Sequence, residues 1–470
     1  MPALARRPFL LLAALVGTTL APVTASAQST LPAAMQAAID SGAGAVLANT
    51  GAPSASIAVV RGGKIVYAKA YGMARIDRAT PATPAMRYSI GSNSKQFTAT
   101  AVLLLAEQHK LSLDDKVSRW LPQLTRANDV TLRQVLSMTS GYQDFWPQDY
   151  VMPPMLQATT AEQIINSWAK KPLDFEPGTK WQYSNTNFVI AGMIVERVAG
   201  MPLVDFLQRN IFTPLRMSSV FISDSSALPS SDPERYMRYA RGPVRVAPKE
   251  GRGWMFAAGE LAMTPSDLAR WDISVIDQKI LKPASYRAQQ TEVLLTNGVG
   301  TGYGLGVDVG TVNGHRAVYH TGEVSGFTSE NLIFPDDSVA VVVLTNLDAA
   351  DAYRQIANRI TAILFGGTDV AADKAVAQAR TIFAGLQRGT IDRSLFTSNA
   401  NAYFSDQALA DFKSSLAPYG KPKSFTQTNQ YLRGGMTFRS FAIELGTKRL
   451  TLTTFTMPDG KLEQYIVSSE

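Results

Sequence analysis

Two side chains in the stretch SIGSNSKQFT, Ser92 and Lys95, have types and a spacing suited to covalent catalysis. Residues three apart lie on the same side of a helix, and this pair opens a nearly all-apolar run to about Glu107 that predicts a buried helix. A serine in the first turn receives the positive end of the helix dipole, and its own backbone N–H can help to hold an oxyanion. Dry surroundings lower the pKa of a lysine toward that of a usable base. The pair therefore predicts acyl transfer to serine without a histidine base.

This spacing alone is weak evidence, because Ser-x-x-Lys recurs at Ser167 and Lys170. There Lys171 and Pro172 end the helix, so the second copy lacks the N-terminal dipole and is interpreted as a solvated face. For Ser92 and Lys95 the alternative is a helix cap beside a surface lysine.

Two further motifs carry polar groups that suit the same chemistry. YSN, Tyr183 to Asn185, opens an apolar helix. A phenol near an ammonium can have a lowered pKa and pass protons, and the Asn185 amide can hold a carbonyl. HTG, His320 to Gly322, lies in a predicted strand, where glycine allows close approach of a substrate backbone. The alternatives are a core tyrosine with a capping asparagine, and an edge-strand histidine.

A conventional Ser-His-Asp hydrolase is the rival chemistry, and the sequence disfavours it. There is no GxSxG elbow, and the nearest string, Gly322 to Gly326, has the wrong spacing. His109 is interpreted as a surface residue and His315 as a turn residue. The absence of cysteine excludes disulfides, thiol catalysis and a lipid-modified cysteine. Three scattered histidines and no HExxH make a metal site improbable, and we expect no cofactor.

SNSK, YSN and HTG, in this order and widely separated, resemble the three active-site motifs of serine β-lactamases and penicillin-binding proteins. The resemblance is nearest to the branch of class C β-lactamases, DD-carboxypeptidases, D-aminopeptidases and related esterases, and it covers about residues 35 to 365. Further stretches that look like this branch are QVLSMTSG, FEPGTKWQYSN and AAGELAMTPSDLARW.

The resemblance implies a role for each residue that matches a motif. Ser92 would be the acylated nucleophile, Lys95 its base, and Tyr183 the proton shuttle to the leaving group. The other groups would contact the substrate: Asn185, His320, Thr321 and Gly322 as binding residues, and the backbone N–H groups of Ser92 and Glu323 as the oxyanion hole.

Two departures from the family pattern bear on the substrate. The third motif usually has Lys in β-lactamases, whereas His320, with an ordinary pKa near 6.5, supplies positive charge only at lower pH. Glu323 places a carboxylate beside the oxyanion position. If it faces the site, it would repel substrates with a terminal carboxylate, including penicillins and D-Ala-D-Ala peptides.

We therefore expect a serine hydrolase of D-amino-acid peptides or esters, like a DD-carboxypeptidase or D-aminopeptidase, with cell-wall peptides as its context. One alternative is a class C-like β-lactamase. The other is a non-catalytic penicillin- or peptidoglycan-binding protein, which would not need Lys95 or Tyr183.

The elements that position these residues follow from the periodicity of apolar residues. A helix at 35–49 and a hairpin at 56–72 precede helices, and strands return from Tyr303, so the sheet of one α/β domain is formed by distant segments. Ser112 and Thr264 are predicted helix starts. The expected fold is a β-lactamase/DD-peptidase-like antiparallel sheet flanked by helices. It would span 28–365, with a helical insertion at about 98–265.

A linker at 366–371 and a small α+β domain at 372–470 are predicted to follow. The domain weakly resembles the nuclear-transport-factor-2-like superfamily. Its Arg433, Arg439 and Glu463 are interpreted as ion-pairing or pocket residues.

The N-terminus predicts export. Residues 1–27 have the layout of a signal peptide: Arg6 and Arg7, then an apolar run, then Ala25-Ser26-Ala27 as a cleavage site. The mature protein should therefore be periplasmic or secreted. The apolar run is too short for a stable membrane anchor. Removal of the signal peptide would lower the net charge of +7 by two. Without a basic run or basic-aromatic stripe, we expect no nucleic-acid partner, only a small-molecule or peptide substrate.

Overall fold

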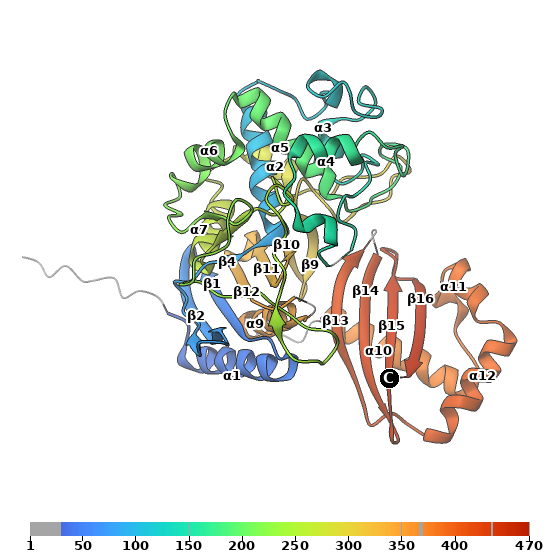
Figure 1. The fold of residues 1–470 in the computed structure, drawn as a ribbon. Coiled ribbons are helices and arrows are strands. Elements are labelled where there is room, and N and C mark those ends of the chain that lie inside the picture. Colours follow the sequence, from blue (N-terminus) through green and yellow to red (C-terminus); the bar gives the residue numbers. More distant parts are fainter. Residues whose placement is uncertain (1–29, 149, 349, 366–369, 434–435, 470) are drawn as a thin grey trace, which may run out of the picture.

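Seven strands form the central sheet of the computed structural model, which describes residues 30–148, 150–348, 350–365, 370–433 and 436–469 (Figure 1). All neighbouring strands are antiparallel, in the order β3-β2-β1-β12-β11-β10-β9. The strands are β1 (Ser54–Arg61), β2 (Lys64–Arg75), β3 (Thr80–Pro81), β9 (Asp308–Val312), β10 (His315–Val324), β11 (Phe327–Phe334) and β12 (Val339–Thr345). The predicted signal peptide lies outside the described residues.

Distant segments close this sheet, as the sequence predicted. Strand β1 pairs with β12 from Ala55 opposite Thr345 to Arg61 opposite Val339. Every residue of β12 is buried, as expected for a continuous apolar run in the centre of a covered sheet. The sheet therefore joins the two ends of the segment from β1 to β12 and leaves the helices between these strands on one side.

Successive side chains of β1 point into two different apolar layers, one on each face of the sheet. Ile57 and Val59 face α1 (Ala33–Thr50) and α9 (Ala352–Phe365), whereas Ala58 and Val60 belong to the layer on the opposite face. That second layer contains α7 (Pro265–Ile276) and the helical region. The sheet is thus sandwiched between helices, as Figure 1 shows.

The helical region is built around two buried helices, α2 (Lys95–Glu107) and α5 (Asn185–Ala199), which pack against each other. Its smaller elements are α3 (Leu132–Leu136), α4 (Ala161–Trp168), α6 (Leu203–Leu207), α8 (Pro283–Gln289), β4 (Tyr88–Ser89), β5 (Phe221–Ile222), β6 (Tyr236–Met237), β7 (Arg245–Val246) and β8 (Leu261–Met263). Among the described residues, no single helix is long and apolar enough to cross a membrane. Within the described ranges, one pair of segments, α5 and Leu203–Phe212, bent by 73°, has the length and composition to cross one together.

Of the two predicted helix starts, one is confirmed and one is wrong. Thr264 caps α7 by accepting a hydrogen bond from the Asp267 N–H. Ser112 begins no helix, because its N–H donates to the Asp115 carboxylate at 2.8 Å and closes a local turn.

The predicted strand from Tyr303 also begins later, at Asp308. Residues 303–307 instead press against the helices. A Cβ on Gly304 would lie 2.0 Å from the Gln289 carbonyl oxygen, and one on Gly306 would lie 2.9 Å from the Ala99 Cβ. This close approach brings Tyr303 beside the predicted site residues.

The C-terminal residues form a separate layered unit of helices and one sheet. Its core contains apolar side chains from residues 379–465. Its elements are α10 (Val370–Arg388), α11 (Ser398–Tyr403), α12 (Asp406–Leu416), β13 (Ser424–Arg433), β14 (Met436–Leu445), β15 (Lys448–Thr456) and β16 (Leu462–Ser469). The strands pair consecutively and antiparallel, so the predicted α+β character is confirmed. Residues 366–369 of the predicted linker lie outside the described residues.

Candidate active site

Ser92 and Lys95 lie together at the start of α2. Ser92 belongs to a single 3-10 turn, Gly91–Ser94, that leads directly into the helix. Lys95 Nζ donates at 2.8 Å to each of three oxygens: Ser92 Oγ, Asn185 Oδ1 and the Ala258 carbonyl. The side chain is fully buried, and burial lowers the pKa of Lys95 to about 7, although the nearby charge of Asp144 acts in the opposite direction. A lysine that is half neutral at pH 7 can take a proton from the bound hydroxyl.

Tyr183 completes the polar triplet from the loop before α5. Its hydroxyl is hydrogen-bonded to Ser92, and its ring centroid lies 5.0 Å from Lys95 Nζ. The predicted lowering of the Tyr183 pKa is wrong, because burial outweighs the favourable contact with Ser92 and raises the pKa. Tyr183 is therefore a neutral phenol at pH 7. It can relay a proton by donating one while it accepts another.

Asn185, the first residue of α5, connects Lys95 to a carboxylate that the sequence analysis missed. Its Oδ1 accepts from Lys95, while its backbone N–H donates to Asp144 Oδ1 at 2.9 Å. Burial raises the pKa of Asp144, and the N–H groups of Trp146 and Asn185 partly oppose this effect. Asp144 lies in the irregular stretch GYQDFW, where no periodicity or motif marks it. In the free protein, Asn185 positions Lys95.

Strand β10 forms the facing wall through contacts that only glycine permits. A Cβ on Gly322 would lie 1.9 Å from the Ile90 carbonyl oxygen, and a Cβ on Gly91 would lie 2.7 Å from the Glu323 backbone nitrogen. Gly91 also has a φ of +53°, which favours glycine. The turn that carries Ser92 therefore touches the backbone of β10, and the Ser92 and Glu323 N–H groups belong to the two touching segments.

His320 is buried in this wall and remains neutral. Its Nε2 lies 3.1 Å from the Tyr303 hydroxyl, and its Nδ1 lies 2.5 Å from the Thr321 carbonyl oxygen. Nδ1 must therefore carry the proton, and Tyr303 donates to Nε2. Burial, followed by the charge of Lys95, lowers the pKa of His320 to about 3. The expectation that His320 gains charge as the pH falls toward 6.5 is wrong.

Thr321 and Glu323 lie on the opposite face of β10 from His320, since side chains alternate along a strand. The exposed Glu323 reaches the rim of the active-site cavity. Burial is the main cause of the raised pKa of Tyr353 in α9, and the charge of Glu323 adds to it. The predicted carboxylate is therefore at the mouth, away from the His320 ring.

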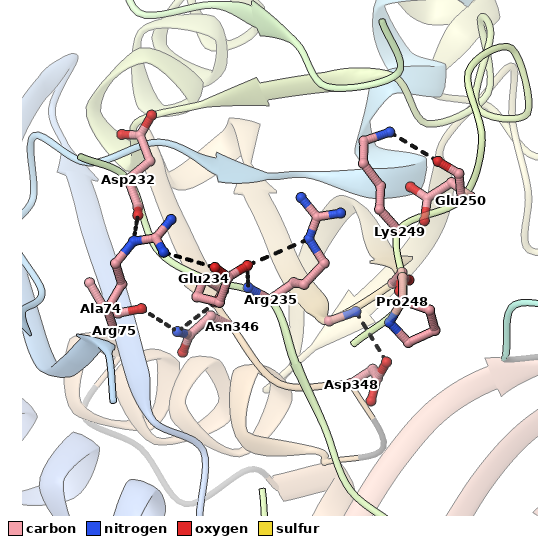
Figure 2. Close-up of polar contacts among 12 residues, drawn as sticks. Ala74, Arg75, Asp232, Glu234, Arg235, Pro248, Lys249, Glu250, Asn346 and Asp348 are labelled. Atoms are coloured by element: carbon pink, nitrogen blue, oxygen red, sulfur yellow. Dashed lines mark hydrogen bonds and ion pairs between the residues drawn. The ribbon is translucent and has the colours of Figure 1, made fainter. Parts of the chain in front are cut away.

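Hydrogen bonds hold the turn that follows Glu323. The Gly326 N–H donates to Asp348 Oδ2 at 3.1 Å, and the Ser325 hydroxyl donates to the Pro248 carbonyl. Behind this turn, Asn346 donates to the carbonyls of Ala74 and Glu234 (Figure 2). Figure 2 shows Asp348, Pro248 and Asn346 in these contacts. Segments that are distant in the sequence therefore hold the turn at the end of β10 in place.

A cavity of about 880 Å³ opens above Ser92, and Tyr183, Asn185, His320 and Glu323 also line it. Its wall is rich in aromatic and acidic side chains. In the described part of the chain, no Lys or Arg lines it, and Lys95 lies beneath Ser92. The aromatic side chains are Phe145, Trp146, Tyr150, Trp181, Tyr183, Tyr239, Trp254 and Tyr303, and the acidic ones are Asp144, Asp308, Glu323 and Asp348. Burial raises the pKa of Asp308 to about 8 and also raises those of Asp144 and Asp348, so Asp308 is mostly neutral at pH 7. The aromatic wall and the absence of Lys and Arg from the described lining still favour neutral or cationic ligands with apolar bodies over anions.

The alternative residues lie elsewhere. His109 is exposed beyond α2, and His315 contacts Asp337 at 3.0 Å at the start of β10. Ser167 and Lys170 are exposed, which confirms the solvated interpretation of that pair. Among the described residues, no group of three or more His, Asp or Glu side chains is placed to hold a metal ion.

Known proteins share this architecture. A penicillin-binding protein of Bacillus subtilis is 28% identical over 330 residues, which cover 66% of this chain and 72% of that protein. Protein flp of Staphylococcus aureus is 27% identical over 307 residues, and the match spans only 60% of its length. A D-stereospecific amidohydrolase from Streptomyces sp. has a TM-score of 0.62 and 26% identity, covering 71% of this chain and 99% of that one.

A structure of wider coverage is the octameric penicillin-binding protein homologue from Pyrococcus abyssi. It covers 92% of this chain and 99% of that one, with a TM-score of 0.63, and at 20% identity it shows the fold alone. The family model described as Beta-lactamase matches residues 34–364. The chain therefore belongs to the beta-lactamase family, and it is a serine hydrolase.

Proposed function

We propose that this protein hydrolyses neutral or cationic amides and esters of D-amino acids through an acyl-enzyme at Ser92. The observation that carries the proposal is the 2.8 Å hydrogen bond between Ser92 Oγ and a buried Lys95 with a pKa of about 7. The 26% identity to a D-stereospecific amidohydrolase supports the substrate stereochemistry.

In the first half-reaction, neutral Lys95 takes the proton of Ser92 as Oγ bonds to the substrate carbonyl carbon. The backbone N–H groups of Ser92 and Glu323 stabilise the oxyanion. As the bond to the leaving group breaks, the proton passes from Lys95 through the Tyr183 hydroxyl to the departing nitrogen or oxygen. Water then attacks the ester, Tyr183 and Lys95 accept its proton, and a proton returns to Ser92 as the acid leaves.

Charge argues for peptidase or esterase activity over the class C-like β-lactamase alternative. Penicillins and D-Ala-D-Ala peptides carry a carboxylate, whereas His320 is neutral and Glu323 lies at the mouth. A carboxylate would thus lose its water without gaining a cationic partner. The same argument makes a DD-carboxypeptidase less favoured than a D-aminopeptidase-like or amidase-like enzyme.

The discriminating experiment compares kcat/KM for four substrates under one set of conditions: a neutral p-nitrophenyl ester, a D-phenylalanine amide, a D-Ala-D-Ala peptide and nitrocefin. We expect turnover of the first two to exceed that of the two anions by at least about a hundredfold, which corresponds to roughly 2.7 kcal/mol. Faster turnover of nitrocefin than of the ester and amide would overturn the proposal in favour of a β-lactamase. Folded protein that turns over none of the four would favour the binding-protein alternative.

We also propose that the protein is exported, on the basis of Arg6, Arg7 and the apolar run in residues 1–27. N-terminal sequencing of protein from the periplasm or medium should begin near Gln28. Intact protein that begins at Met1 and stays in the cytoplasm would contradict export.

A further inference from the structure

A second cavity, of about 840 Å³, adjoins the active site on the other side of Tyr183. Three consecutive residues, Trp181 to Tyr183, line both cavities. The remaining wall of the second cavity comes from the C-terminal sheet: Met436, Phe455, Glu463 and Gln464. Figure 1 shows this sheet beside the hydrolase region. The C-terminal unit therefore borders the residue whose hydroxyl is bonded to Ser92.

The strand register explains why these side chains face the cavity. Phe455 pairs with Phe438 and Gln464, and all three lie on the face of the sheet opposite the core that α10 to α12 cover. The rings of Phe438 and Phe455 are 5.2 Å apart, so Phe455 is held in place. Glu463 is the extra residue of a β-bulge, a feature that re-aims side chains.

Glu463 supplies a fixed negative charge to this cavity. Its carboxylate accepts from Thr397 Oγ1 at 2.5 Å and from Asn399 Nδ2 at 2.9 Å, and these bonds lower its pKa, with Thr397 as the larger cause. Glu463 was one of the three residues predicted to form ion pairs or line a pocket. The hydrogen bonds that hold its carboxylate come from the uncharged side chains of Thr397 and Asn399. Arg439 donates to Gln430 at 3.0 Å and lines a different cavity. The side chain of Arg433 lies outside the described residues.

The remaining wall is apolar or amide-bearing. Trp181, Met436 and Phe455 provide apolar surface, and Gln182 and Gln464 provide amides. The Trp181 Nε1–H is buried without a hydrogen-bond partner, which leaves one donor for a bound molecule. No Lys or Arg from the described chain lines the cavity. Its chemistry fits a ligand with an apolar body, a hydrogen-bond acceptor and a positive charge.

We propose that the C-terminal sheet forms the leaving-group subsite of the enzyme, and that it selects amines with an apolar body and a positive charge. The inference rests on the proposed acyl-enzyme at Ser92. Since Tyr183 delivers the proton to the leaving group, the departing atom must lie at its hydroxyl. The rest of the leaving group then extends into the cavity that Tyr183 shares with Phe455 and Glu463.

The test uses one acyl group, D-phenylalanyl, joined to three leaving groups: methanol, norleucine amide and lysine amide. The two amides have the same aliphatic chain and differ in the terminal ammonium. In the wild type, kcat/KM should favour lysine amide over norleucine amide about fivefold, the size of a partly exposed ion pair. Glu463→Gln should abolish this preference, and Phe455→Ala should lower both amides about tenfold relative to the methyl ester.

Matched controls come from the same sheet. Glu444→Gln and Ile466→Ala change exposed residues that do not line the cavity, and they should keep the wild-type ratios. The inference is overturned if Glu463→Gln and Phe455→Ala also keep those ratios, or if they change the methyl ester and the amides equally.

Failure of the proposed function would look different, because the wild type would then turn over none of the three substrates. In that case lysine amide and norleucine amide are titrated directly against tryptophan fluorescence. Tighter binding of lysine amide that Glu463→Gln removes would support the subsite, and equal binding of both amides would refute it.

Discussion

The pH dependence of acylation should report the pKa of Lys95, because only the neutral amine can accept the Ser92 proton. With a pKa of about 7, the neutral fraction of Lys95 rises from about one in eleven at pH 6 to about ten in eleven at pH 8. We therefore expect kcat/KM for a neutral ester to increase about tenfold over this interval and to level off above pH 8. A lysine titrating at its ordinary value of 10.5 would instead give about a hundredfold increase without a plateau.

The assay measures kcat/KM for a p-nitrophenyl ester from pH 5 to 10, with the spontaneous hydrolysis subtracted at each pH. His320→Gln serves as the control, because a histidine with a pKa of about 3 does not titrate in this range. An unbroken rise beyond pH 9 would refute the buried-lysine reasoning. A limb near pH 6.5 that disappears in His320→Gln would show that the histidine, and not Lys95, controls the rate.

Two further predictions concern the wall formed by β10. His320→Lys introduces a second cation near Lys95, which should lower the pKa of Lys95 and move the acid limb of the pH–rate profile to lower pH. The new charge should also increase turnover of carboxylate-bearing substrates. An unmoved acid limb would contradict the proximity of residue 320 to Lys95. Gly322→Ala should reduce kcat/KM for the ester by about a hundredfold, since its Cβ would lie 1.9 Å from the Ile90 carbonyl oxygen and displace the wall. Gly44→Ala, whose Cβ meets nothing within 4 Å, should leave kcat/KM unchanged, and equal activity of both glycine variants would refute the role of the close approach.

Local sequence patterns predicted most elements of the sheet and the contact between Ser92 and Lys95. Ser92 and Lys95 are neighbours within one turn, so their contact follows from helical spacing. The approach of Tyr183 and Asn185 to that pair is long-range, and only the resemblance to a family implied it. The apolar alternation of β1 and the unbroken apolar run of β12 were enough to indicate a covered sheet.

The electrostatic character of the site could not be predicted in the same way. A pKa depends on burial and on neighbours that come from distant segments. His320 is neutral because it is buried near Lys95, and Tyr303, predicted in a strand, donates to it from a loop. Asp144 had no pattern around it. Phe455 and Glu463 line the second cavity because the C-terminal unit packs beside the hydrolase region. No local periodicity in the sequence encodes the packing of these two units.

Covalent labelling of Ser92 tests the central claim most directly. Folded wild-type protein is treated with a neutral fluorophosphonate, measured by intact mass and mapped by peptide digestion. We predict one adduct, on Ser92, that is absent from Ser92→Ala and that forms much more slowly in Lys95→Ala. An unlabelled wild type, or equal labelling of Ser92→Ala, would contradict the acyl-enzyme account.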